Sequence, residues 1–363
     1  MRLILLHFLT VFIGCFYLNG QNNKKSNISW DVIYANGTLL EHNPDIAGLI
    51  EDRTNKFTLR YNRVSKGNAE WEQQYNFPDW GFTFSFQDMG NPDLGQNIAL
   101  YGHYTFYFFK RNIAMTIGQG IAYNTNPYDA QTNFRNIAYG SSLLSSTYVD
   151  IRYKKRISKH IGFSLGFDIY HYSNGNFKAP NTSTNTFSFA TGLFYSLDED
   201  IAYEKKEPIK YSEPIAYNFA FSSGINESDV IGSGQFPFYN FSVFADKRLS
   251  YKSAIQLGTE VFFSNFLKEF IRFRSIAFPE DNLTGNEDYK RVGVFVGYEL
   301  HLRKIAAFAN LGYYIYYPFD FEGRVYNRIG LKRYFKKKIF ASLSVKSHAA
   351  KAEAVEVSLG IRL

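Results

Sequence analysis

The chain has 363 residues, of which 18% are aromatic and 20% charged, and its formal net charge is +7. This modest charge, spread over short basic runs, gives no indication of nucleic-acid binding, and no stretch beyond the N-terminal segment has the ~20 continuous apolar residues of a transmembrane helix. A high aromatic content with a mildly polar mean hydropathy of −0.27 is typical of transmembrane β-barrels, whose strands alternate lipid-facing and lumen-facing side chains.

The first twenty residues have the pattern of a secretory signal peptide. Arg2 supplies a short positive region, residues 3–18 are almost wholly apolar, and the polar and small residues Asn19, Gly20 and Gln21 follow. This apolar stretch is too short to span a membrane, so we expect cleavage near Gly20.

Cys15 is the only cysteine and lies in that segment. The mature protein would have none, which excludes disulfides, cysteine-based zinc sites and thiol nucleophiles. A secreted chain that enters a membrane without apolar helices crosses it as a closed barrel.

Alternating segments separated by polar turns occupy the rest of the chain. The clear ones lie at 98–109, 113–123, 147–153, 161–173, 186–197, 216–224, 236–245, 254–263, 292–302, 306–316, 325–334 and 339–345, and the weaker ones at 28–35, 57–64 and 80–86. The last segment, 355–363, alternates cleanly and resembles the C-terminal signal that barrel-assembly machinery recognises. Barrels of single bacterial chains have even numbers of strands, so we expect about 14, with 12 or 16 as alternatives.

The pattern predicts one all-β domain, a transmembrane antiparallel barrel over residues 21–363 in the cell outer membrane of a Gram-negative bacterium. No Pro-rich or Ser-rich linker divides it, and no internal repeat is visible. Long connections at 124–140, 174–185 and 264–290 fall on the same, outward side if the strands are counted as above.

The segment at 161–173 carries an unusual pair of residues at its end. One of its faces holds the apolar row Phe163, Leu165, Phe167 and Ile169. The same face continues into His171 and Ser173, whereas Asp168 falls on the opposite face, which we expect to line the lumen. An imidazole and a hydroxyl at the end of a lipid-facing row can meet a substrate that arrives from the membrane.

The returning segment places Asn185 at its near end, where it can stand beside His171, because facing side chains of neighbouring strands lie within a few ångströms. A serine hydroxyl is a weak nucleophile until an imidazole takes its proton, and the imidazole needs a third group to fix its tautomer. The N–H groups of Asn174, Gly175 or Asn181 could stabilise an oxyanion. On spacing alone, a hydrogen-bonded surface pair is the commoner role for such residues.

The sequence His-Tyr-Ser-Asn-Gly at 171–175, followed by Pro180 and Asn181, resembles the active-site signature of the lipid A 3-O-deacylases, the PagL-like acyloxyacyl hydrolases. The specific similarity covers residues 167–188. It implies an outer-membrane barrel that removes an ester-linked acyl chain from lipid A of lipopolysaccharide without a cofactor. No pair of histidines has metal-ligand spacing, and whether a metal ion supports the outer loops is open.

The resemblance also assigns roles to individual residues. It implies Ser173 as the nucleophile and His171 as the base, with Asn174 and Asn181 shaping the turn or the oxyanion site. We add Gly175 to that support group and Asn185 to the catalytic group because of their positions beside the pair.

Two features depart from the family. Its third catalytic residue is usually a glutamate on the next strand, where this chain has Asn185, whose amide oxygen can orient a histidine but cannot stabilise an imidazolium by charge. The chain is also about twice as long as the compact eight-stranded enzymes, so residues 198–363 have no assigned role. A non-enzymatic barrel is therefore the alternative: a porin, a transporter or a component of an envelope machine. The oligomeric state is open.

Overall fold

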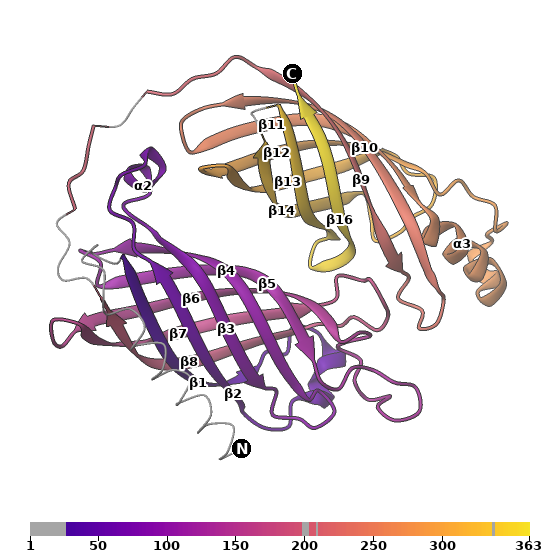
Figure 1. Ribbon diagram of the computed structural model, residues 1–363. Helices are drawn as coiled ribbons and strands as arrows, with labels where there is room; N and C mark the ends of the chain where they lie inside the picture. The colour runs from indigo at the N-terminus through magenta and orange to yellow at the C-terminus, as the bar shows by residue number, and fades with distance from the viewer. Residues whose placement is uncertain (1–26, 198–202, 208–209, 336–337) are drawn as a thin grey trace.

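The protein forms two barrels rather than one. The computed structural model describes residues 27–197, 203–207, 210–335 and 338–363, and the expected signal peptide lies outside these ranges. Within them, sixteen antiparallel strands make two closed walls of eight (Figure 1).

The first wall is built from strands in chain order. They are β1 (Ile28–Leu39), β2 (Thr54–Arg63), β3 (Asp79–Asp88), β4 (Gln96–Phe108), β5 (Ile113–Asn124), β6 (Leu143–Arg156), β7 (Ile161–Ser173) and β8 (Thr184–Ser196). β8 closes the wall on β1, with Ser29 opposite Ser196 and Leu39 opposite Thr186. The short helices η1 (Pro44–Leu49) and α2 (Glu70–Gln74) lie in the β1–β2 and β2–β3 connections.

The second wall repeats this order. Its strands are β9 (Ala216–Glu227), β10 (Gln235–Arg248), β11 (Ser253–Ser264), β12 (Arg291–Leu302), β13 (Ile305–Tyr316), β14 (Val325–Phe335), β15 (Ile339–His348) and β16 (Lys351–Arg362). β16 closes the wall on β9. Helices α3 (Asn265–Ala277) and η2 (Pro279–Asp281) lie in the β11–β12 connection.

The expected all-β antiparallel architecture is confirmed, and the three weak segments at the start of the chain are strands. The sixteen strands differ from the preferred count of 14 but match the upper alternative, whereas the expected single wall is wrong, since the strands close twice. Alternation shows which face of a strand is apolar. Where the barrel closes depends on which strand pairs with β1, and the local sequence pattern does not show this. The connection at 197–215 divides the chain, and its sequence is rich in charge rather than in proline or serine.

The outer faces of the strands are apolar and the lumens are polar. In β7 the side chains of Leu165, Phe167 and Ile169 are exposed, as expected for a row that faces lipid. Asp168 points the other way, as its parity predicts, and its carboxylate lies 2.5 Å from Nζ of Lys56 in the first lumen. None of the helices in the described ranges is long and apolar enough to span a membrane.

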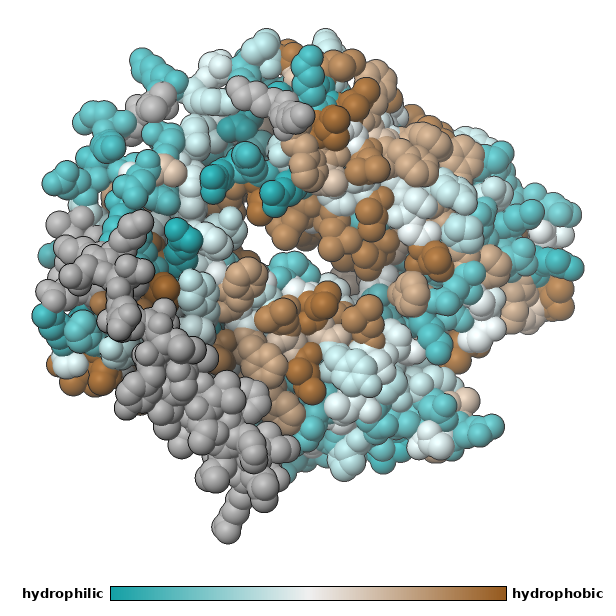
Figure 2. All heavy atoms as spheres, in the orientation of Figure 1, coloured by the Kyte–Doolittle hydropathy of each residue, from teal (hydrophilic) through white to brown (hydrophobic). Residues whose placement is uncertain are grey.

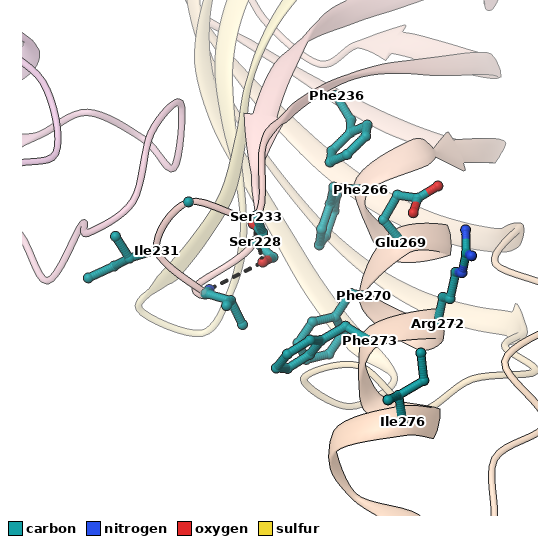
Figure 3. Close-up of a pocket in the computed structure, with 12 residues that line it drawn as sticks. Ser228, Ile231, Ser233, Phe236, Phe266, Glu269, Phe270, Arg272, Phe273 and Ile276 are labelled. Atoms are coloured by element: carbon teal, nitrogen blue, oxygen red, sulfur yellow. Dashed lines mark hydrogen bonds between the residues drawn. The ribbon is translucent and has the colours of Figure 1, made fainter.

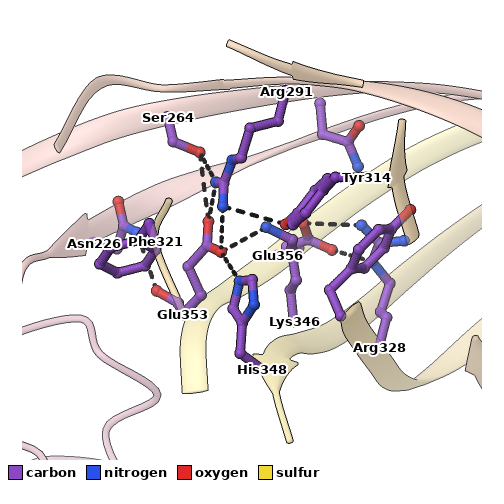
Figure 4. A network of polar contacts seen from close by, with 12 residues as sticks. Asn226, Ser264, Arg291, Tyr314, Phe321, Arg328, Lys346, His348, Glu353 and Glu356 are labelled. Carbon is purple, nitrogen blue, oxygen red and sulfur yellow. Dashed lines mark hydrogen bonds and ion pairs between the residues drawn. The ribbon is translucent and has the colours of Figure 1, made fainter. Parts of the chain in front are cut away.

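The lumen of the second barrel is filled by paired charges. Oε1 and Oε2 of Glu353 lie 2.5 Å from Nη2 of Arg291 and 2.6 Å from Nζ of Lys346, and Arg328 joins Glu260 to Glu356 beside them (Figure 4). All six of these side chains are buried. Because these buried charges neutralise one another in the lumen, they fill the interior of the barrel instead of lining a wide water-filled channel.

The two barrels touch at both edges. The strand order places the connections 125–142 and 174–183 at one edge of the first barrel, here called the outer edge. At the outer edge, Glu227 N donates to Asn176 O at 3.0 Å, and at the opposite edge Tyr75 Oη donates to His301 O at 2.8 Å. Between the walls, Figure 2 shows an opening with hydrophobic side chains along its right and lower borders.

Candidate active site

Strands β7 and β8 bring His171 and Asn185 together at the outer edge of the first barrel. The two residues are direct cross-strand partners, and Nδ1 of His171 lies 2.8 Å from Oδ1 of Asn185. An amide oxygen can only accept a hydrogen bond, so Nδ1 carries the proton and Nε2 keeps a lone pair. The contact predicted from the sequence is therefore present, in the tautomer that a general base requires.

Ser173 follows two residues later on the same face and is held by the turn after β7. Its Oγ donates to Oδ1 of Asn181 at 3.1 Å and accepts from the N–H of Gly175 at 3.0 Å. Among the contacts of the described residues, no hydrogen bond joins Ser173 to His171. Residues i and i+2 on a strand are about 6.6 Å apart along the chain, so activation of this hydroxyl by His171 would require it to reorient toward Nε2. Catalytic hydrogen bonds often form only in the substrate complex.

The Gly175 N–H donates to the hydroxyl oxygen of Ser173 itself. Gly175 has φ +64°, a left-handed conformation that glycine adopts without strain. A Cβ placed there would lie 2.3 Å from Cγ2 of Val355, which belongs to β16 of the second barrel. Glycine is therefore required both by the backbone conformation and by the close approach of the other barrel.

Asn174 and Asn181 have different roles in the turn. Asn174 supports it internally, because its Nδ2 donates to Lys178 O at 2.5 Å and its Oδ1 accepts from Asn176 N at 3.0 Å. Oδ1 of Asn181 accepts from both Ser173 Oγ and Asn174 N. Nδ2 of Asn181 has no protein hydrogen-bond partner among the described contacts, whereas Oδ1 of the same side chain holds Ser173.

Residues from distant connections hold the turn in place. Gly140 N donates to Pro180 O at 2.6 Å, and Tyr139 forms a hydrogen bond with Thr184 at the start of β8. Burial raises the pKa of Tyr139, so its hydroxyl stays protonated. His42, in the β1–β2 connection, lies 3.0 Å from Thr182 O. These contacts could not be predicted from the sequence, because each joins connections that are remote along the chain.

The second barrel also reaches this turn. Oε2 of Glu227, the last residue of β9, accepts from Ala179 N at 2.9 Å. Beyond it, the β9–β10 turn and α3 border a cavity of about 440 Å³ whose lining includes Phe236, Phe266, Phe270 and Phe273 (Figure 3). Neither Glu227 nor any histidine is among the residues that line this cavity.

No outward His–Ser pair exists at the equivalent end of the second barrel. β15 is the seventh strand there, as β7 is in the first barrel, and it ends in Lys346, Ser347 and His348. Lys346 and His348 both contact the lumenal Glu353, and two residues, Ala349 and Ala350, connect β15 to β16. Among the described residues, the second barrel therefore has no counterpart of the His171–Ser173 arrangement at this strand end.

Comparisons with known proteins divide the chain into two parts, which correspond to its two barrels. Residues 55–194 match the family model described as lipid A 3-O-deacylase (PagL), and residues 215–363 match the model described as acyloxyacyl hydrolase, C-terminal domain. None of the curated proteins compared with the chain matches it.

Two solved structures illustrate the similarities of shape. The crystal structure of the outer membrane enzyme PagL is 19% identical and covers 45% of this chain and 97% of its own, with a TM-score of 0.34. A mutant of the Rh. blastica porin is 10% identical and covers 93% of this chain and 99% of its own, with a TM-score of 0.19. At these TM-scores neither similarity supports an assignment.

Proposed function

We propose a mechanism on the premise that the first barrel belongs to the lipid A 3-O-deacylase (PagL) family and the second to the C-terminal domain family of the acyloxyacyl hydrolases. This membership supports deacylation of lipid A and ester hydrolysis as the class of reaction. The barrel fold fits an outer-membrane protein. Insertion by barrel-assembly machinery stays a prediction, based on the alternation of the last strand.

In this proposal, Ser173 and His171 remove an ester-linked acyl chain from lipid A in the outer leaflet of the outer membrane. The observation that carries it is the hydrogen bond from His171 Nδ1 to Asn185 Oδ1. That bond leaves Nε2 as the basic nitrogen on a face whose neighbouring residues point toward lipid, where an acyl ester of a membrane glycolipid is available.

The reaction has two half-steps. Nε2 of His171 takes the proton of Ser173 as Oγ attacks the ester carbonyl carbon, and the tetrahedral oxyanion accepts hydrogen bonds from Gly175 N and Asn181 Nδ2. His171 then returns the proton to the departing alcohol oxygen of lipid A, which leaves an acyl-Ser173. Water attacks this ester with His171 as base, and the fatty acid is released.

Asn185 takes the place of a carboxylate in this scheme. It orients the imidazole and sets its tautomer, which are two of the functions of a third catalytic residue. It offers no charge to stabilise the imidazolium that forms during proton transfer, so we expect catalysis with a lower kcat than a carboxylate would support.

The test is mass spectrometry of lipid A from cells that express the wild-type chain, Ser173→Ala or His171→Ala. We expect loss of one acyl chain with the wild type only. Ser164→Ala is the matched control, because Ser164 is buried on the opposite face of the same strand and its loss should leave deacylation unchanged.

Continued deacylation by Ser173→Ala would rule out the proposed nucleophile. An unchanged lipid A mass in every strain, with the protein inserted and the ester present, would favour the non-enzymatic barrel.

A further inference from the structure

The turn that holds Ser173 is flanked by the second barrel. Glu227 lies at the end of β9, and its two carboxylate oxygens accept from Ala179 N at 2.9 Å and from Gly234 N at 3.2 Å. Its own N–H donates to Asn176 O at 3.0 Å. One side chain thus joins the β9–β10 turn of the second barrel to the catalytic turn of the first.

Neighbouring contacts strengthen this junction. Gln235 Nε2 donates to Phe177 O at 2.7 Å, and Val355 of β16 packs against Gly175. Residues 175–179 therefore contact the second barrel along most of their length.

The burial of Glu227 makes its position informative. Its exposed fraction is 3% and that of Ala179 is 2%, and no lysine or arginine of the described ranges forms an ion pair with it. A buried carboxylate is costly unless other groups meet its charge. Here two backbone N–H groups do so, and hydrogen bonds to an ionised acceptor are the stronger kind.

A short series of hydrogen bonds continues from this junction to the nucleophile. Asn176 N donates to Oδ1 of Asn174, and Asn174 N donates to Oδ1 of Asn181. The same Oδ1 accepts from Ser173 Oγ. A shift of the turn at Asn176 would therefore move the group that holds the serine.

We propose that Glu227 is a positioning residue for the hydrolytic site, and that the second barrel holds the catalytic turn in its working conformation. This inference rests on the proposed function. It gives residues 215–363, which have no outward His–Ser pair at the equivalent edge, a role in the reaction of the first barrel.

The experiment compares kcat and KM of the purified full chain on lipid A in mixed micelles. For Glu227→Ala we expect kcat to fall roughly 10- to 100-fold with KM little changed, since a displacement of about 1 Å in a catalytic group costs up to ~10²-fold. Glu227→Gln keeps one acceptor oxygen and should give an intermediate kcat.

Glu280→Ala is the matched control. Glu280 lies at the outer edge of the same barrel, in η2 of the β11–β12 connection, and is exposed, with no contact to the catalytic turn among the described residues. Its replacement should leave kcat at the wild-type value.

Each outcome decides a separate question. An inactive wild type contradicts the proposed function, whereas an active wild type with unchanged kcat in Glu227→Ala overturns the positioning role alone. A rise of KM without loss of kcat also overturns it, because that result indicates a substrate contact. Folded protein is isolated by its migration in unheated gels, and if Glu227→Ala yields none, Glu227→Gln decides by whether its kcat is lower or unchanged.

Discussion

His171 donates a hydrogen bond of 2.8 Å from Nδ1 to Oδ1 of Asn185, its direct cross-strand neighbour. The register of the β7–β8 hairpin alone sets this contact, so two strands define the orientation of the imidazole. The side chain that orients the imidazole, that of Asn185, carries no charge.

Replacement of Asn185 should separate orientation from charge. Asn185→Ala removes the acceptor, and we expect kcat to fall roughly 100-fold, within the ~10²- to 10⁴-fold contribution of general acid–base catalysis. Asn185→Asp keeps the shape and adds the missing charge, so kcat should equal or exceed that of the wild type. Steady-state kinetics on lipid A measure both, and an Asp variant as slow as the Ala variant would contradict this role.

Gly175 and Val355 should be energetically coupled across the two barrels. Gly175→Ala places a Cβ against Val355 and a side chain at φ +64°, and we expect a lower kcat and lower stability. Val355→Ala removes the clashing methyl group, so the double variant should recover part of both losses. The left-handed backbone keeps a cost of about 1–2 kcal/mol.

A double-mutant cycle on urea unfolding and on kcat measures this coupling. Strictly additive effects would mean that the two barrels do not meet at this point in the membrane.

The buried charges of the second barrel should be sensitive to the loss of one partner. Glu353→Ala leaves Arg291 and Lys346 without their shared carboxylate, and breaking a buried pair costs about 3–5 kcal/mol. Urea unfolding in lipid vesicles measures the loss. Glu280→Ala, at an exposed position, serves as the control, and equal stability of the two variants would be inconsistent with the packed lumen.

The apolar row of β7 should tolerate charge poorly. Phe167 is 51% exposed on the outer face, and Phe167→Arg should destabilise the inserted protein by about 2–4 kcal/mol if that face meets the middle of the bilayer. Asn286→Arg, in the exposed β11–β12 connection, should have little effect. The free energies of unfolding of the two variants are again compared by urea unfolding in vesicles. A Phe167→Arg variant as stable as the wild type would mean that this face is not in lipid.

The parts of the fold that are set locally could be predicted from the sequence. Alternation identified the strands and the outward face of β7, because side-chain direction on a strand has a period of two. The number of walls could not be predicted this way. It depends on whether β8 pairs with β1 or with β9, and both choices bury the same residues.

The same distinction between local and long-range contacts applies to the candidate site. The contact between His171 and Asn185 follows from a single hairpin and was predicted. Asn181 was expected to support the turn, but its hydrogen bond to Ser173 depends on how residues 174–183 fold back. Glu227 gave no signal, since its contact joins residues 48 positions apart in different barrels.

Independent closure of the two walls separates the folding of the first barrel from the completion of its outer turn. All inter-strand pairs of the first wall form among residues up to Ser196, so this wall can close without any strand of the second. The turn after Ser173 gains its contacts with Glu227 and Val355 only when the second wall stands beside it. If the first barrel is the proposed hydrolase, a closed first wall without its neighbour would therefore be folded but would lack the contacts that hold the turn after Ser173.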